Sequence, residues 1–583
     1  MTQPPPPGRD PAEGPARDSG LPGGATEGPG DGPRAAGGSR DPRLAGFAEG
    51  GPGDTCTPGP ELAATLADLS GPQWRCQDAT DEELIGLLGR WDAIESWAEA
   101  AKLGVVRELL RRRGRPGLLG APSMHGDLPD RWEDGVEHEV SAALQVSLRS
   151  ADNLTCFAWD LQARLPGIGA ALAAGVLTPL KARIISDELK VLDDEHAVQA
   201  EKLILDQLDG QTPAQLGRLA AQMVVTVDPD GAARRREHAE REEARVRFWR
   251  DNGGACALAA FGLPTDAALA ANDAINNRAE QYKAAKTRPG ARMDQLRVLA
   301  FLDILNGIAL ETRIAQDRAA QAGEADGPGG TFPDDDGSAT SGLVPSPIRP
   351  ALTARANLTF PLATLQGLAD RPGTGHGLGP LDPALVRDAA VAAANSPASE
   401  WCLTITDGEG VAVAHGCARP ARTSKTSPPP ASRDGPRAPM PWALTPRDEP
   451  GSSGEYGTWD LTLPGGHQYT VKLQPIPVTD CDHRHESHGY QPNDTLRHLV
   501  QVRDGTCTFP PCNRHARESD FEHAVPYDQG GKTCACNGGA RSRRCHRVKQ
   551  SPGWTVTQPQ PGWHVWKTPS GRTYTQGPMQ YPV

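Results

Sequence analysis

Residues 519–549 of the chain read SDFEHAVPYDQGGKTCACNGGARSRRCHRVK. An acidic residue directly precedes a histidine at Glu522 and His523, an asparagine follows at Asn537, and a second histidine stands at His546. The local pattern places the first histidine on a strand, the asparagine in a loop and the second histidine on a helix. Carboxylate, amide and imidazole groups bind metal ions and transfer protons, so this order indicates a catalytic or metal site.

Basic charge gathers at this end of an otherwise acidic chain. The 583 residues carry a net charge of −13, yet residues 501–583 hold 11 Lys and Arg against 5 Asp and Glu. The C-terminal charge is therefore +6, which leaves −19 on residues 1–500. A basic end favours a polyanion as its partner, and chance clustering on a solvated face is the alternative.

Cysteines gather in the same region. Five of the 12 lie there: Cys507, Cys512, Cys534, Cys536 and Cys545. The first residues, MTQPPPPGRD, show no secretory signal, and no apolar run approaches 18 residues, so we expect a cytoplasmic protein without a membrane span. In that compartment such a cluster favours metal binding over disulfides. The cysteines before Cys481 are interpreted as packing residues or idle thiols.

The fold class expected from the whole chain is α+β and multidomain. Gly- and Pro-rich composition predicts three disordered stretches: residues 1–60, 323–350 and 418–456. Apolar residues at spacings of three and four predict a mostly helical domain over residues 75–322. Alternating patterns around turns predict β-hairpins within 351–417 and at 457–479. A compact module with C-terminal strands is expected over 490–583.

The series of His, Asn and His resembles the HNH endonuclease motif, which has the ββα-metal nuclease fold. The resemblance implies that His523 is the base that deprotonates a water molecule for attack on a phosphodiester. It also implies that Glu522 and His546 hold a divalent ion against the scissile phosphate. Asn537 corresponds to the residue that fixes the base-bearing loop or joins the metal. Oxygen ligands with a single histidine suit Mg²⁺ or Mn²⁺.

A structural zinc ion is also implied, because many HNH domains brace their small core with zinc on two cysteine pairs. The ligands predicted here are Cys507, Cys512, Cys536 and Cys545. Ser542 stands where the second pair usually begins, which is a departure from the family's pattern. Cys534, or the Cys and His residues of CDHRHESHGY (481–490), are alternative sources of the fourth ligand. Reduced thiols packing a small core are the remaining alternative.

Five cations are predicted to contact DNA phosphates along the helix that carries His546: Arg541, Arg543, Arg544, Arg547 and Lys549. Such contacts neutralise the backbone without reading its sequence. The alternative is that these charges only stabilise the C-terminus of the helix.

The resemblance extends beyond this module. Segments such as ANLTFPLATLQGLADRPG and WCLTITDGEGVAVAHGCARP are similar to the actinobacterial DUF222-containing HNH endonucleases, also called 13E12-repeat proteins. The similarity runs from about residue 75 to the end and implies a helical domain of unknown role before a DNA-cleaving module. Self-association through the helical domain is a further expectation. Two alternatives stay open: a non-catalytic zinc and DNA-binding protein, and an interaction protein acting through its helices.

Overall fold

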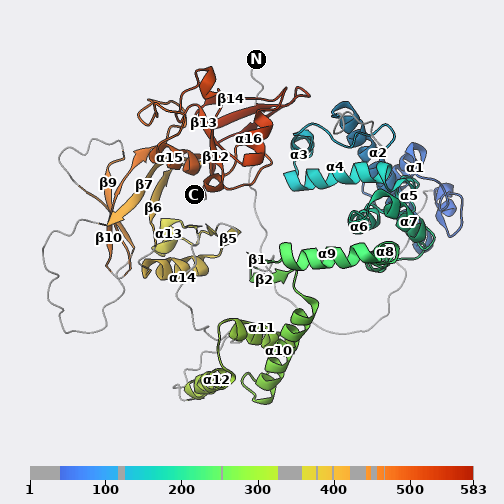
Figure 1. Cartoon of the computed structure of the whole chain (residues 1–583), viewed down its shortest axis with the longest axis horizontal. Helices are drawn as coiled ribbons and strands as arrows, with labels where there is room; N and C mark the ends of the chain where they lie inside the picture. Colours follow the sequence, from blue (N-terminus) through green and yellow to red (C-terminus); the bar gives the residue numbers. More distant parts are fainter. Residues whose placement is uncertain are drawn as a thin grey trace, which may run out of the picture. The chain divides into compact units, whose positions relative to one another are not determined.

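The structure is a computed structural model that combines helices with several small antiparallel sheets (Figure 1). It describes residues 40–115, 125–250, 254–325, 357–375, 379–396, 399–420, 442–447, 456–464 and 466–581. The chain divides into two compact units, residues 1–94 and 95–583. Among the described residues, no helix is both long enough and apolar enough to cross a membrane.

The first unit contains η1 (Pro42–Phe47), α1 (Pro60–Ser70) and the start of α2 (Asp81–Arg112). The composition predicts disorder up to residue 60, but order begins earlier. Leu44 and Phe47 of η1 are buried. Burial of these two large apolar side chains stabilises the short segment. The average Gly-rich composition of the region nevertheless predicts disorder there. The rest of the predicted tail, residues 1–39, lies outside the described residues.

Helices dominate the next two hundred residues, as the apolar spacing predicts. They are α3 (Val136–Leu144), α4 (Leu148–Ala163), α5 (Pro166–Ala173), α6 (Pro179–Leu189), α7 (Asp194–Leu205), α8 (Pro213–Val227), α9 (Pro229–Glu242), α10 (Thr265–Ala284), α11 (Met293–Leu305) and α12 (Leu310–Ala325). Caps from Ser147, Thr178 and Asp193 begin three of them. Phe157 and Ile185 lie in the shared apolar core of α2 to α8.

One hairpin interrupts the helices. It consists of β1 (Arg245–Arg250) and β2 (Cys256–Phe261), which pair antiparallel. The prediction of helix throughout this region was therefore wrong here. The segment RVRFWR begins with alternating charged and apolar residues and contains a β-branched residue and two aromatic ones, a composition that favours a strand.

The middle of the chain forms two sheets. The smaller consists of β3 (Leu358–Thr359), β4 (Gly373–Gly375) and β5 (Gly379–Leu381), with α13 (Leu362–Leu365) and α14 (Pro383–Ala394) next to these strands in the chain. The larger has the order β11-β7-β10-β9-β8, with β6 paired to β7. Its strands are β6 (Cys402–Thr406), β7 (Ala412–Pro420), β8 (Ala443–Pro446), β9 (Thr458–Thr462), β10 (Gln468–Lys472) and β11 (Gln474–Pro475).

The hairpins β6–β7 and β9–β10 lie where the alternation predicts them. Strand β8, however, lies inside the stretch 418–456 that was predicted to be a disordered linker. The segment around it is apolar: Trp442 is buried, and Leu444 pairs with Leu461 of β9. Residues 326–350 of the first predicted linker, and residues 421–441 and 448–455 of the second, lie outside the described residues.

The C-terminal region begins with α15 (Asp494–Asp504), which Asn493 caps by accepting a hydrogen bond from the Leu496 amide. It continues through η3 (Ala516–Glu518), β12 (Asp520–His523), η4 (Tyr527–Gln529), β13 (Gly538–Arg541) and α16 (Arg543–Lys549). A three-stranded sheet follows: β14 (Thr555–Gln560), β15 (Trp563–Lys567) and β16 (Thr573–Gln576). Trp566 of β15 is fully buried against Phe509 and Trp554, and its indole donates to the Thr508 carbonyl at 2.7 Å.

We predict that Trp566→Ala lowers the unfolding free energy of the region around β14–β16 by about 3–5 kcal/mol, because it leaves a large cavity in the core. Trp563 on the same strand is 43% exposed, so Trp563→Ala is the matched control and should cost less than about 1 kcal/mol. Amide hydrogen exchange of the full chain measures both. Equal losses of protection in the two variants would contradict the prediction.

Candidate active site and metal centres

Two short strands and a helix bring the predicted catalytic residues together. Strand β12 pairs antiparallel with β13, so that His523 lies opposite Gly538. Asn537 immediately precedes β13, and α16 follows it after Ser542, whose hydroxyl caps the helix by accepting from the Cys545 amide. His546 therefore faces β12 from α16. The strand, loop and helix expected for the three residues are all present.

The carboxylate of Glu522 meets the imidazole of His546. Glu522 Oε2 lies 2.9 Å from His546 Nε2, and Glu522 Oε1 accepts from Lys549 Nζ at 2.8 Å. Asp520 Oδ2 binds the other ring nitrogen of His546 at 3.0 Å. Burial alone would raise the pKa of Glu522, but hydrogen bonds from His546 and Lys549 lower it to about 2. The hydrogen bond with Glu522, aided by Asp520, raises the pKa of His546.

This pair has the spacing of two metal ligands. Neighbouring ligands on an octahedral ion at about 2.1 Å stand about 3 Å apart. The carboxylate oxygen of Glu522 and Nε2 of His546 match that separation, and both groups suit a divalent cation. A carboxylate and an imidazole at this separation match two ligands of the Mg²⁺ or Mn²⁺ ion that the resemblance to HNH endonucleases implies.

His523 is buried beside this pair. Its Nε2 lies 2.8 Å from the Thr533 hydroxyl, and the ring of Tyr490 stacks on it at 5.4 Å. Burial lowers the pKa of His523 below its ordinary value, and the nearby cation of Lys549 lowers it further. A neutral imidazole at physiological pH is the form that accepts a proton.

Asn537 closes the loop between β12 and β13. Its side-chain oxygen accepts from the Val525 amide at 2.8 Å, while its nitrogen donates to the carbonyls of Val525 and Lys532 at 3.0 and 2.9 Å. Gly531 completes the turn, since a Cβ there would lie 1.9 Å from the Val525 carbonyl oxygen. These contacts fix the loop that follows His523, and fixing a loop is one of the two roles expected for Asn537.

Two of the five predicted phosphate-binding cations are buried. Arg541 lies on β13, not on α16, and is fully buried; its guanidinium donates to the carbonyls of Glu522 and His523 at 3.1 and 3.2 Å. Arg541 therefore cannot reach a DNA phosphate, and its prediction as a DNA contact is corrected: it supports β12 instead. Lys549 is nearly buried against Glu522.

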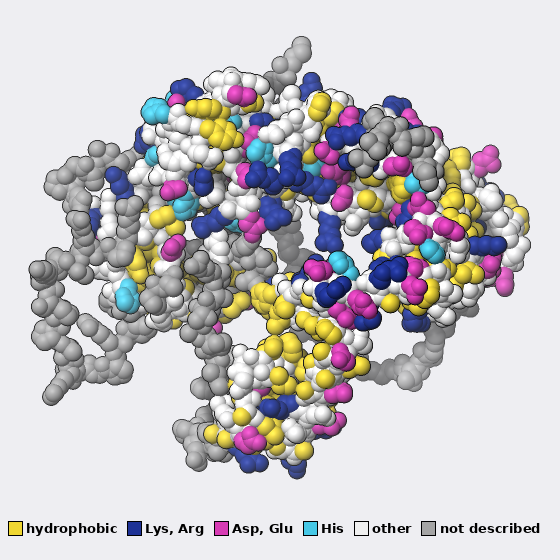
Figure 2. Space-filling model, in the orientation of Figure 1, with side chains coloured by type: hydrophobic (Ala, Val, Ile, Leu, Met, Phe, Trp, Pro, Cys, Tyr) yellow, Lys and Arg dark blue, Asp and Glu magenta, His cyan; other side chains and the backbone are white. Residues whose placement is uncertain are grey.

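The other three cations, Arg543, Arg544 and Arg547, are exposed on α16. Arg543 pairs with Asp520 at 3.2 Å, and Arg544 pairs with Glu137 at the start of α3 at 3.0 Å. Figure 2 shows Lys and Arg side chains gathered over the region of α16. This surface has the charge needed to contact a phosphate backbone.

Among the residues that the structure describes, three groups of cysteine and histidine side chains have ligand atoms close enough to share a metal ion, such as zinc. The first contains Cys507, Cys512 and Cys545, which are buried. The structure does not bring Cys536 to these three, so the predicted set of four is corrected. Beside them lie Ser542 Oγ, 3.6 Å from Cys512 Sγ, and His138 Nε2 of α3, 3.7 Å from Cys545 Sγ.

The second group holds Cys536 instead. It joins Cys534 with two residues of the segment 481–490: Cys481 and His483. Cys534 Sγ lies 3.4 Å from Cys481 Sγ and 3.3 Å from His483 Nδ1. Three thiols and one imidazole make a complete tetrahedral set for zinc. Because the segment TCACN (533–537) ends at Asn537, this group lies directly beside the loop that Asn537 closes.

The third group was missed by the sequence interpretation. It contains Cys402, His415, Cys417 and His498. The sequence contained a signal for this group. His415 and Cys417 are two residues apart on a strand and share a face, and the hairpin places Cys402 opposite Cys417. The early cysteines were interpreted as packing or idle, and His498 lies on a helix 81 residues later, a proximity that only the tertiary fold creates.

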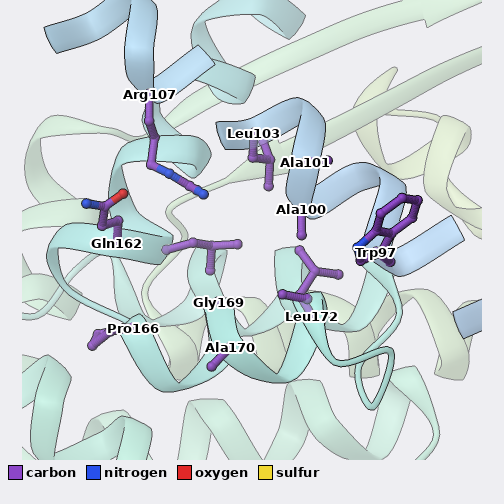
Figure 3. Close-up of a pocket in the computed structure, with 12 residues that line it drawn as sticks. Trp97, Ala100, Ala101, Leu103, Arg107, Gln162, Pro166, Gly169, Ala170 and Leu172 are labelled. Atoms are coloured by element: carbon purple, nitrogen blue, oxygen red, sulfur yellow. The ribbon is translucent and has the colours of Figure 1, made fainter. Parts of the chain in front are cut away.

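The helical domain contains a cavity of about 410 Å³ among α2, α4 and α5 (Figure 3). Leu and Ala side chains form most of its wall, with the polar groups of Arg107 and Gln162 at one end and Trp97 at the other. Arg107 already donates to the Ala158 carbonyl. None of the predicted site residues lines this cavity.

Residues 93–292 match the family described as Domain of unknown function (DUF222). The chain contains a DUF222 domain. The uncharacterized protein Rv3776 of Mycobacterium tuberculosis is 37% identical over 98 residues, which are 17% of this chain and 18% of that protein. The uncharacterized protein Rv2100 of the same species is 32% identical over 152 residues, which are 23% and 26% of the two chains. The matches thus span about a quarter or less of these actinobacterial relatives, and no solved structure matches the chain.

We predict that Asn537→Ala loosens the loop over residues 524–533, because three hydrogen bonds to its backbone are lost. At about 0.5–1.5 kcal/mol for each hydrogen bond, the free energy of local opening should fall by about 1.5–4.5 kcal/mol. Amide exchange of Val525 reports it directly. Gln529→Ala, an exposed change in the same loop, is the control. Unchanged protection of Val525 in Asn537→Ala would contradict the assigned role.

Proposed function

We propose that the protein is a metal-dependent endonuclease of the HNH type that hydrolyses phosphodiester bonds in DNA. The observation that carries the proposal is the distance of 2.9 Å between Glu522 Oε2 and His546 Nε2, which is the separation of two neighbouring ligands on a divalent ion. The buried histidine beside this pair is His523. The β12–β13–α16 arrangement supports it, because it presents His523 and Asn537 in the order of the HNH motif.

In this proposal His523 is the general base. The Thr533 hydroxyl holds its Nε2, which leaves Nδ1 to take the proton of an attacking water. Asn537 keeps the loop closed, and Arg541 fixes the backbone of β12 through two carbonyls. Each residue thus has a positioning contact that suits its role.

Glu522 and His546 would hold the divalent ion, which supplies charge stabilisation at the scissile phosphate when bound. Asp520 orients His546 through the second ring nitrogen, as partners of metal-binding histidines commonly do. Arg543 and Arg547 on α16 would contact the flanking phosphates, which binds DNA without a sequence preference.

We predict that the full-length protein relaxes or linearises supercoiled plasmid with Mg²⁺ or Mn²⁺, and that EDTA stops the reaction. His523→Ala should lower the rate by about 10²–10⁴-fold, the usual contribution of a general base. His238→Ala removes an exposed histidine of α9 and serves as the matched control.

Cleavage by His523→Ala at the unaltered rate would overturn the assignment. The non-catalytic alternative predicts something different: plasmid bound by the unmodified protein in a gel-shift assay with no cleavage under either metal. If the variant Arg543→Glu/Arg547→Glu then fails to bind plasmid while it keeps its fold, the function is that of a DNA-binding scaffold.

A further inference from the structure

A hairpin and a helix from different parts of the chain bring four metal-binding side chains together. Cys402 lies on β6, His415 and Cys417 lie on β7, and His498 lies on α15. Their four ligand atoms all lie within 4.8 Å of one another. We call this set the β7–α15 group. It is separate from Glu522 and His546, and nothing in the nuclease proposal requires it.

The separations lie close to those around a tetrahedral zinc ion. Zinc binds sulfur at about 2.3 Å and nitrogen at about 2.0–2.1 Å, so its four ligands stand about 3.3–3.8 Å apart. Cys417 Sγ lies 3.2 Å from Cys402 Sγ, 3.5 Å from His498 Nδ1 and 3.9 Å from His415 Nε2. Two thiols and two imidazoles are a common structural zinc set.

The sheet register builds most of the site. Cys402 pairs with Cys417, and Thr404 pairs with His415, across the same two strands. The Thr404 hydroxyl lies 2.8 Å from His415 Nδ1, which leaves Nε2 directed at the sulfur atoms. A hydrogen-bond partner on the second ring nitrogen is characteristic of metal-binding histidines, since it fixes the tautomer.

Cys417 is the centre of the group. Its sulfur lies no more than 3.9 Å from Cys402 Sγ, His415 Nε2 and His498 Nδ1. The rings of the two histidines lie 4.6 Å apart.

Apolar packing brings the helix to the hairpin. Leu499 and Val502 of α15 form a buried cluster with Ala412 of β7 and Ile476, which follows β11. His498 therefore approaches β7 on a surface that is already packed. The same helix ends in Arg503 and Asp504, which bind the backbone of the β12–β13 module.

We propose that the β7–α15 group binds a structural zinc ion and thereby clamps the β6–β7 hairpin to α15. The alternative for the two cysteines is a cross-strand disulfide. A disulfide would not need the two histidines that converge on Cys417, and it would leave Thr404 without a function in orienting His415. The arrangement of all four side chains therefore favours the metal.

Zinc content tests the proposal in the full-length protein. Cys402→Ser/Cys417→Ser should contain one zinc equivalent less per chain than the unmodified protein, measured by plasma mass spectrometry after purification under reducing conditions. Cys156→Ser/Cys256→Ser, which removes two exposed cysteines outside the three groups, should keep the full content. An unchanged zinc content in Cys402→Ser/Cys417→Ser would overturn the proposal.

Thiol protection in the unmodified protein tests it without any substitution. Both cysteines are exposed, so an alkylating reagent can reach them once the metal has gone. Peptide mass spectrometry should show alkylation of Cys402 and Cys417 becoming about tenfold faster or more after a zinc chelator is added, because bound thiolates are poor nucleophiles. Equal rates with and without the chelator, or a disulfide joining the two residues in the reduced preparation, would overturn the proposal.

Discussion

A buried ion pair at the end of α15 organises the candidate active site. Arg503 Nε donates to Asp504 at 2.7 Å, and both side chains are 1% exposed. The remaining guanidinium nitrogens donate to the carbonyls of Ala535 and Gly538, while Asp504 accepts from the Ala540 amide. Removing one partner of such a pair leaves an uncompensated buried charge and costs about 3–5 kcal/mol. These hydrogen bonds therefore attach both the loop that carries Asn537 and the strand β13 to the C-terminal end of α15.

Groups of side chains that could hold a metal ion lie at this same helix and loop. The set containing Cys534 and Cys536 lies directly before Asn537, and the β7–α15 group includes His498 near the middle of α15. The module is small, and its apolar core is divided between the cluster around Trp566 and smaller clusters such as that of Leu496 and Val500. Small cores commonly depend on metal ions for stability, which gives these groups a physical reason to exist.

The sequence predicts what is local and misses what depends on distant partners. The order of Glu522, His523, Asn537 and His546 resembles the HNH motif, and this resemblance predicts the strand, loop and helix on which they lie. The wrong assignments have another origin. Arg541 was expected on the surface of a helix because charged residues are usually exposed, but two carbonyls and Trp566 occupy its guanidinium. Likewise, Cys536 joined a group whose other members include Cys481 and His483, about fifty residues earlier.

Binding of Mn²⁺ tests most directly whether Glu522 and His546 form a metal site. Electron paramagnetic resonance of free Mn²⁺, titrated with zinc-loaded full-length protein, counts the bound ions. One site per chain is predicted, and Glu522→Gln, which keeps the shape but removes the charge, should abolish it or weaken it by about tenfold or more. Equal Mn²⁺ binding by the unmodified protein and Glu522→Gln would contradict the account.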